Sequence, residues 1–362
     1  MTSEQNAPVD AAMGPRDRIT LTSGERFAWM TSEHTEWGIR ARPGERGLRL
    51  ADINIGSYGE VPDVWPYDTE IPRGALPNET AEGMGYSIFE KQEVWAESCA
   101  ELYEDAIQAR WAPATDIPWA SLSPLPREIE AAVCQLSTDL SQRAYAAGAC
   151  ISGWLQHISY GYLEVKSYLA TQIFEHSRHA EAFRKRALAN GGGLGIEPPN
   201  TFTQRYMEAM NFSEALLCID VLEAAFQVAL FEAGDELAQN EAERELYRRC
   251  LGDKLRHLQY GREHLAWVVE HAPQRAKELQ RYLAKAEHAM VADIEQPISS
   301  EPLIVLFGGG LEGIDRGAAR LHALRRAQVE RYLQTLREAG FDHADFPLHS
   351  HLAAFTEQPV EA

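Results

Sequence analysis

The sequence predicts an all-α protein whose body is a bundle of four long helices. Two stretches, 175–179 and 253–257, resemble each other, because each ends in Arg-His behind an acidic residue. Such repetition is expected of a bundle built from two helix pairs. Apolar residues also recur at helical spacing in four long segments. These segments are 128–159, 161–189, 213–234 and 241–271.

Composition limits the protein's partners and location. The formal net charge of −20 argues against nucleic acid and anionic membrane surfaces, which select for clustered Lys and Arg. The five cysteines include no CxxC pair, which favours reduced thiols over a disulfide framework. Residues 1–20 are polar, and the apolar run 303–307 is much shorter than a membrane span. We therefore expect a soluble cytoplasmic protein without a membrane or nucleic-acid partner.

The chain divides into four parts by composition. Residues 1–20 are rich in Ala, Pro, Asp and Gln and are expected to form a disordered tail. Residues 21–87 contain short alternating segments broken by Gly and Pro, which predicts an irregular, partly β arm. Residues 88–295 are expected to form the bundle, and 296–362 a helical C-terminal extension.

Local signals set the ends of several helices. A first helical pattern covers 89–111, and the run of glycines at 191–193 ends the second long helix. Asn with Glu three residues later forms a capping-box signal at 211–214 and again at 240–243. An amphipathic helix at 314–339 carries many Arg residues on one side, which predicts a solvated or subunit-facing surface.

Five ionisable residues fall at one level on the inward stripes of the long helices. Burying so many ionisable groups is unfavourable unless they pair with one another or bind a metal. Their matched depth favours a functional site, and a purely structural polar layer is the alternative. The five residues are His176, His179, Glu223, Lys254 and His257.

Several short runs resemble ferritin-like proteins of the ribonucleotide-reductase-like group. This group includes bacterial di-iron oxygenases and oxidases, several of them in natural-product pathways. The resemblance covers about residues 88–270 and implies a ferritin-like four-helix bundle. The runs are LYEDA at 102–106, ATDIPW at 114–119, LATQ at 169–172 before Arg178 and His179, and VLE at 221–223.

The resemblance also shows which metal-binding residues have changed. The first-helix Glu of the family falls on Ala144, and the two bridging Glu positions fall on His176 and Lys254. The resemblance implies that the acidic residues Glu175 and Asp253 hold the ring N–H of the opposite histidine. Three of the four metal-binding carboxylates are absent, and the retained candidate ligands are His179, Glu223 and His257.

These changes leave a site with one metal ion or with none. Two divalent ions need several anionic oxygens between them, and Lys254 adds a positive charge instead. One Fe(II) or other divalent ion could bind His176, Glu223 and His257, a two-His, one-carboxylate set, with His179 as a further candidate in the other half of the site. A metal-free site is the alternative, in which Lys254 replaces the cation and pairs with Glu223.

The expected function is that of a ferritin-like oxidoreductase or related catalyst acting on a small metabolite, in specialised metabolism. In the metal-free alternative, Lys254, His179 and Glu223 perform acid/base chemistry. A third possibility is a non-catalytic partner of another ferritin-like protein. A homodimer through the long helices is also expected from the resemblance.

Overall fold

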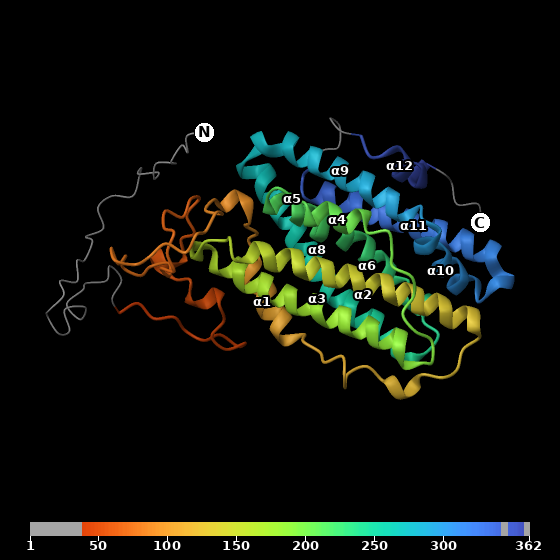
Figure 1. Cartoon of the computed structure of the whole chain (residues 1–362). Helices are drawn as coiled ribbons and strands as arrows, with labels where there is room; N and C mark the ends of the chain where they lie inside the picture. The colour runs from red at the N-terminus through yellow and green to blue at the C-terminus, as the bar shows by residue number, and fades with distance from the viewer. Residues whose placement is uncertain (1–37, 342–346, 358–362) are drawn as a thin grey trace.

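The computed structural model describes residues 38–341 and 347–357, and these form an all-α protein (Figure 1). The tail expected at 1–20 and the beginning of the arm lie outside the described residues. The division of the chain at residues 87 and 295 stays a prediction.

The four-helix bundle is present, with one helix built from three pieces. Helix α2 packs along α3, α6 packs against α8, and α3 also contacts α8 (Figure 1). The third bundle helix runs from α5 through the π-helical segment η7 into α6. The bounds are Arg127–Leu155 for α2, Leu163–Ala189 for α3, Phe212–Leu216 for α5, Leu217–Glu223 for η7, Ala224–Glu232 for α6 and Glu241–His271 for α8.

Both predicted capping boxes form. The Asn211 side chain accepts a hydrogen bond from the backbone N–H of Glu214 at 2.9 Å, and Asn240 does the same for Glu243 at 3.0 Å. Each glutamate bonds back to the chain before its helix, as Glu243 does with the N–H of Gln239. These contacts satisfy backbone donors that a helix start leaves without partners.

The helix expected at 89–111 is shorter than predicted. Helix α1 covers only Cys99–Gln108, because the preceding backbone binds the N-terminal arm. Trp65 donates its N–H to the carbonyl of Phe89 at 2.8 Å, and Lys91 donates to that of Asp63 at 2.7 Å. Beyond these contacts, the described arm contains isolated β-bridges and the 3₁₀ turns η2 (Ala51–Ile53), η3 (Gly56–Gly59) and η4 (Lys91–Glu93). The β content of the whole arm stays a prediction.

The C-terminal helices cover one side of the bundle. Helices α10 and α11 pack on each other, α10 against α2 and α11 against α6 (Figure 1). No helix in the described ranges is long and apolar enough to cross a membrane. The remaining elements are η5 (Trp119–Ser121), η6 (Tyr160–Tyr162), α4 (Thr201–Met207), α7 (Gly234–Leu237), η8 (Pro273–Arg275), α9 (Ala276–Ile294), α10 (Pro297–Gly308), η9 (Leu311–Gly313), α11 (Ile314–Glu338) and α12 (Ser350–Glu357).

Candidate functional site

A layer of polar side chains crosses the bundle between two clusters of buried apolar residues. The fully buried members of these clusters leave gaps at 141–146 on α2, 170–181 on α3 and 251–257 on α8. The predicted polar residues of α3 and α8 lie in these gaps, and Glu223 joins them from η7. All five predicted residues are at most 2% exposed. The sequence therefore located the layer correctly.

Two histidine–carboxylate pairs connect α3 with α8. His179 Nε2 lies 2.8 Å from Asp253 Oδ2, and His257 Nε2 lies 2.8 Å from Glu175 Oε2. This is the crossed arrangement implied by the resemblance. An ionised carboxylate can only accept a hydrogen bond, so each histidine ring is assigned its hydrogen on Nε2. The Nδ1 atoms of both rings are buried and have no hydrogen-bond partner among the described residues.

Two arginines complete these pairs. Arg178 Nη2 donates to Asp253 Oδ1 at 2.7 Å, and Arg256 donates to both Glu175 and Asp253. Burial works to raise the pKa of Asp253, but the His179 hydrogen bond and nearby positive charges hold it well below its usual value. For Glu175, burial and the Asp253 charge prevail and raise the pKa to about 6. The four charged groups form one connected network.

His176 lies inside this network with no hydrogen-bond partner of its own in the described structure. Neither ring nitrogen is bonded, although the residue is fully buried. Its ring centroid lies 4.9 Å from that of His257 and 6.3 Å from that of His179. Burial, followed by repulsion from Lys254, holds the pKa of His176 well below its usual value. The ring is therefore neutral near pH 7.

Lys254 lies at the centre of α8 and is only 1% exposed. Burial lowers the pKa of this ammonium, while the charges of Glu223 and then Asp220 oppose that shift. A lysine at this depth is stable only if carboxylates compensate its charge or if it loses a proton. The charge of Lys254 is thus coupled electrostatically to two buried acids.

Glu223 contacts side chains of α6 and α2. Its Oε1 accepts a hydrogen bond from Gln227 Nε2 at 3.3 Å and lies 3.7 Å from Arg143 Nη1. Its Oε2 has no hydrogen-bond partner among the described residues. Burial raises the pKa of Glu223 to about 7 despite the attraction of Lys254 and Arg143. Near neutral pH this side chain therefore exists in both protonation states.

Asp220 is a member of the site that the sequence reading missed. Helical spacing placed Glu223 inward, but all residues of the π-helical segment η7 are buried, Asp220 included. Gln172 donates a hydrogen bond to Asp220, and burial raises the pKa of Asp220 to about 8. A Cβ added at Gly261 would lie 2.4 Å from the Asp220 carbonyl oxygen, so glycine permits α8 to approach η7 closely. The one sequence signal for Asp220 is an acidic residue within an otherwise apolar run, 215–222.

Arg143 is a second residue that the sequence reading did not assign to the site. It bonds Asp139 through Nε at 3.0 Å and Asp293 through Nη2 at 2.9 Å, besides its contact with Glu223. Burial lowers the pKa of Arg143, but these three carboxylates outweigh it and raise the pKa above its usual value. Arg143 thus anchors Glu223 to α2 and, through Asp293, to α9.

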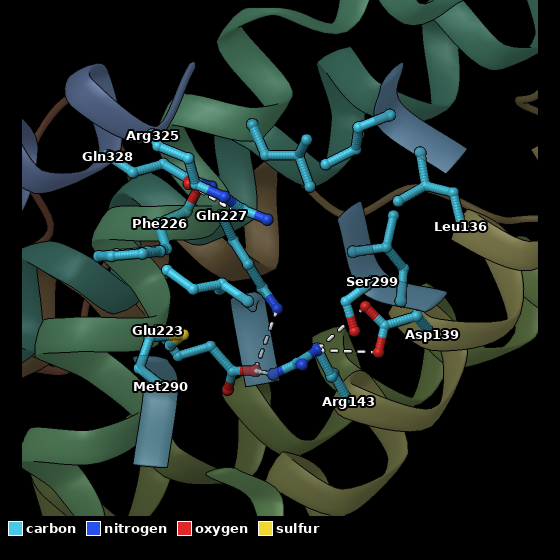
Figure 2. A pocket seen from close by; sticks show the side chains of 14 residues that line it. Leu136, Asp139, Arg143, Glu223, Phe226, Gln227, Met290, Ser299, Arg325 and Gln328 are labelled. Atoms are coloured by element: carbon cyan, nitrogen blue, oxygen red, sulfur yellow. Dashed lines mark hydrogen bonds and ion pairs between the residues drawn. The ribbon is translucent and has the colours of Figure 1, made fainter. Parts of the chain in front are cut away.

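A cavity of about 60 Å³ lies beside Glu223 (Figure 2). In Figure 2 the side chains of Glu223, Gln227 and Arg143 meet at one end, and those of Arg325 and Gln328 approach from α11. By the volume that one buried water occupies, the cavity holds on the order of four water molecules. The other lining residues are Leu136, Asp139, Leu140, Phe226, Leu230, Met290, Ile294, Ser299 and Leu303.

The resemblance implies a metal site, for which the spacing of the candidate histidine rings is decisive. Two imidazoles on one ion, each nitrogen about 2.1 Å from it, have ring centres about 5 Å apart in tetrahedral geometry. The pair His176 and His257 fits this spacing at 4.9 Å, whereas His179 lies 6.4 Å from His257. In the part of the chain that the structure describes, no three His, Cys, Asp or Glu residues are arranged to hold a metal ion. The predicted ligands His176, Glu223, His257 and His179 therefore do not fit a shared ion.

Ala144, at the position of the first-helix carboxylate, adds no ligand. It is buried on α2 in the gap between the apolar clusters. By the resemblance, the positions of three metal-binding carboxylates thus hold a methyl group, an imidazole and a lysine amine. A di-metal centre needs bridging anionic oxygens, which these groups do not supply.

Comparison with known proteins identifies the fold but not the function. No family model and no curated protein sequence matches this chain. One similar solved structure is R2-like ligand-binding oxidase with aerobically reconstituted metal cofactor after photoconversion, at a TM-score of 0.53 and 16% identity over 67% of this chain and 94% of that one. The same oxidase with aerobically reconstituted Mn/Fe cofactor after a long soak gives 0.53 and 17%, over 67% and 93%. Identity this low shows the fold alone. The chain therefore has the ferritin-like fold of the R2-like ligand-binding oxidases.

Proposed function

We propose that this protein is a metal-independent acid/base catalyst that acts on a small molecule held beside Glu223. The observation that carries the proposal is the burial of Lys254, coupled by charge to Glu223 and Asp220, at a position where the resemblance implies a metal-binding carboxylate. A cation at this point repels divalent metal ions and attracts the carboxylates that would bind them. Lys254 takes the electrostatic role of the missing ion.

Glu223 is the group that exchanges a proton with the substrate. It lines the cavity, and it has one oxygen without a hydrogen-bond partner in the described structure. General acid/base catalysis is most effective when the pKa of the catalytic group lies near the working pH. The pKa of Glu223 at about 7, set by burial, meets this condition.

Lys254 and Arg143 position Glu223 and set its charge. Both groups attract the carboxylate form, so they limit the rise in pKa that burial causes. The negative charge of Asp220 also attracts the charged form of Lys254 and so raises the pKa of the lysine. Proton loss from Glu223 is therefore coupled to the state of the Lys254 and Asp220 pair.

The reaction class inferred from these residues is proton transfer to or from a small metabolite, in keeping with the specialised metabolism that the resemblance suggests. An oxidation would need an electron acceptor, and we do not assign one. A non-catalytic role in a complex with another ferritin-like protein predicts that Glu223 and Lys254 only fix the helix register.

The test combines metal loading with the protonation state of Glu223. Purified full-length protein is incubated anaerobically with Fe(II), Mn(II) or Zn(II), desalted, and analysed for metal. In parallel, carbon-13 NMR of glutamate-labelled protein follows Glu223, assigned by Glu223→Gln, against pH. We expect no retained metal and a titration near neutral pH. Lys254→Met should move that titration to higher pH, because one positive charge is lost, while Glu245→Gln on the outer face of α8 should leave it unchanged.

Retention of metal would favour the second candidate function, that of a site with a single metal ion. The spacing of the His176 and His257 rings favours a single ion as the alternative. One equivalent of retained metal that is lost in His176→Leu and Glu223→Gln would overturn the metal-free proposal. A Glu223 that stays ionised throughout the neutral range would equally exclude it as the acid/base group.

A further inference from the structure

Asn190 follows the last residue of α3, and it is the one asparagine among the seven in the sequence that precedes a glycine. Gly191 and Gly192, the next two residues, are exposed. Gly191 lies in the left-handed region at a φ of 85°, and a Cβ added there would meet no atom within 4 Å. The backbone after Asn190 is therefore unhindered and open to water.

The side chain of Asn190 connects the end of α3 with the start of α2. Its Nδ2 donates a hydrogen bond to the carbonyl oxygen of Ser123 at 2.9 Å and another to Oε2 of Glu130 at 2.8 Å. Ser123 precedes α2, and Glu130 lies in the first turn of that helix. A carbonyl oxygen and an ionised carboxylate only accept hydrogen bonds, so both contacts need the NH2 group of an amide.

Glu130 belongs to a buried ion cluster that joins the ends of three long helices. Arg186 of α3 bonds Glu130 through Nη1 at 2.8 Å and Glu243 of α8 through Nε at 2.5 Å. Burial works to raise the pKa of Glu130, but hydrogen bonds from Arg186 and Asn190 hold it below its usual value. In these ion pairs one guanidinium compensates two carboxylates, and Asn190 supplies a further donor without a charge.

An asparagine followed by glycine can react with its own backbone. The backbone nitrogen of Gly191 attacks Cγ of Asn190, so a C–N bond forms while the bond from Cγ to Nδ2 breaks and ammonia leaves. Water then opens the cyclic imide at one of its two carbonyl carbons, which gives aspartate or isoaspartate. The net reaction converts amide and water into acid and ammonia, without electron transfer. A side chain on the second residue hinders ring closure, and glycine has none.

We propose that Asn190 is a site of spontaneous deamidation, and that its conversion to an acid loosens the end of the bundle where α2, α3 and α8 meet. The new carboxylate cannot donate to Ser123 or Glu130, so two hydrogen bonds are lost. It also brings a third negative charge to a cluster that contains one guanidinium, and like charges in a buried cluster repel strongly. The inference is independent of the proposed function, because Asn190 lies outside the polar layer.

The first experiment compares all seven asparagines in one sample of folded, full-length wild-type protein. The protein is kept at neutral pH, digested at intervals, and analysed by mass spectrometry for conversion of each asparagine to an acid. We expect position 190 to convert several-fold faster than any other. Asn200 is the internal control, because it ends the same loop but precedes Thr201. Asn190→Gln keeps the amide but must close a larger ring, so this position should stay unconverted.

Variants then measure the consequence of conversion. Asn190→Asp should lower the melting temperature by several degrees, and Asn190→Ala, which loses the hydrogen bonds without adding a charge, should lower it less. Asn78→Asp is the matched control, because Asn78 is exposed and its Oδ1 only accepts hydrogen bonds, from the N and Oγ1 of Thr80. An aspartate accepts both bonds as well, so this variant should melt as the wild type does.

Three results would overturn the proposal. Conversion at position 190 no faster than at the other asparagines, or conversion only after unfolding in urea, would mean that the hydrogen bonds of the folded protein protect Asn190. An unchanged melting temperature in Asn190→Asp would remove the effect on the bundle. Equal losses in Asn190→Asp and Asn190→Ala would remove the role of the added charge in the cluster of Arg186, Glu130 and Glu243.

Discussion

The polar layer contains two parts that are built in opposite ways. In the outer part, Glu175 and Asp253 each accept bonds from a histidine and from arginines, so the two negative charges face two guanidinium charges. In the inner part, His176 and one oxygen of Glu223 have no hydrogen-bond partner in the described structure, and Lys254 lies beside two acids of raised pKa. The outer part holds the helices in register. The inner part contains the groups on which the proposed function depends.

The largest expected effect comes from breaking the outer part. Asp253→Ala removes a partner of Arg178, His179 and Arg256 at once and leaves Glu175 alone to compensate two largely buried guanidiniums. We expect the free energy of unfolding to fall by about 3–5 kcal/mol. Urea unfolding followed by circular dichroism measures it.

The matched control for this variant is Asp235→Ala. Asp235 has an 82% exposed side chain and pairs with Arg244 at 3.2 Å. Exposed pairs of this kind contribute about 0–1 kcal/mol. Similar losses in the two variants would mean that the outer part is no more important for stability than a surface ion pair.

The sequence predicted the outer part better than the inner part. The resemblance implies the crossed pairing of Glu175 and Asp253 with the opposite histidines, and both pairs are present. Asp220 could not be found in the same way, because residues 212–231 are all buried and no single face of this helix points to the core. Periodicity identifies an inward helix face only where the opposite face is exposed.

Arg325 was missed for a different reason. The many arginines of the helix predicted at 314–339 indicated a solvated or subunit-facing surface, and Arg326 and Arg331 do pair with surface carboxylates. Arg325 is instead buried against the cavity. Which of several arginines on one helix faces inward depends on the packing of α11 against α6, and the sequence alone does not state that packing.

A smaller effect is expected from Asp220→Asn, and it should depend on pH. The pKa of Asp220 in the folded protein, about 8, lies above its unfolded value near 3.8. Its contribution to stability is therefore complete below pH 4 and is lost as the pH rises toward 8. An asparagine does not titrate. The free energy of unfolding of the variant should therefore rise relative to that of the wild type by about 1 kcal/mol per pH unit between pH 5 and pH 7.

Unfolding by urea at several pH values measures this difference. Gln172 from α3, Lys254 from α8 and Glu223 from η7 act on Asp220 in both proteins, so their own titration largely cancels in the comparison. A difference between the two proteins that does not change with pH would mean that Asp220 is ionised in the folded protein. That result would place Asp220 with the matched charges of the outer part.

The smallest change in stability is expected from Lys254→Met, although this residue is central to the proposed function. Removing one member of a buried ion pair is usually costly because the other charge is left alone. Here the remaining acids, Glu223 and Asp220, have pKa values of about 7 and about 8 and can take up a proton near neutral pH at little cost. We therefore expect the free energy of unfolding at pH 7 to stay within about 1 kcal/mol of the wild-type value.

The same variant should lose stability relative to the wild type as the pH rises from 7 to 9. At higher pH the unfolded chain ionises both acids freely, whereas the folded variant must either hold their protons or bury two negative charges without Lys254. Urea unfolding of the variant and the wild type at pH 7 and pH 9 measures whether their difference in unfolding free energy grows in this direction. If Lys254→Met instead lost 3–5 kcal/mol at pH 7, as expected for Asp253→Ala, Lys254 would belong to the matched outer charges. The distinction between a structural outer part and an exchangeable inner part would then be wrong.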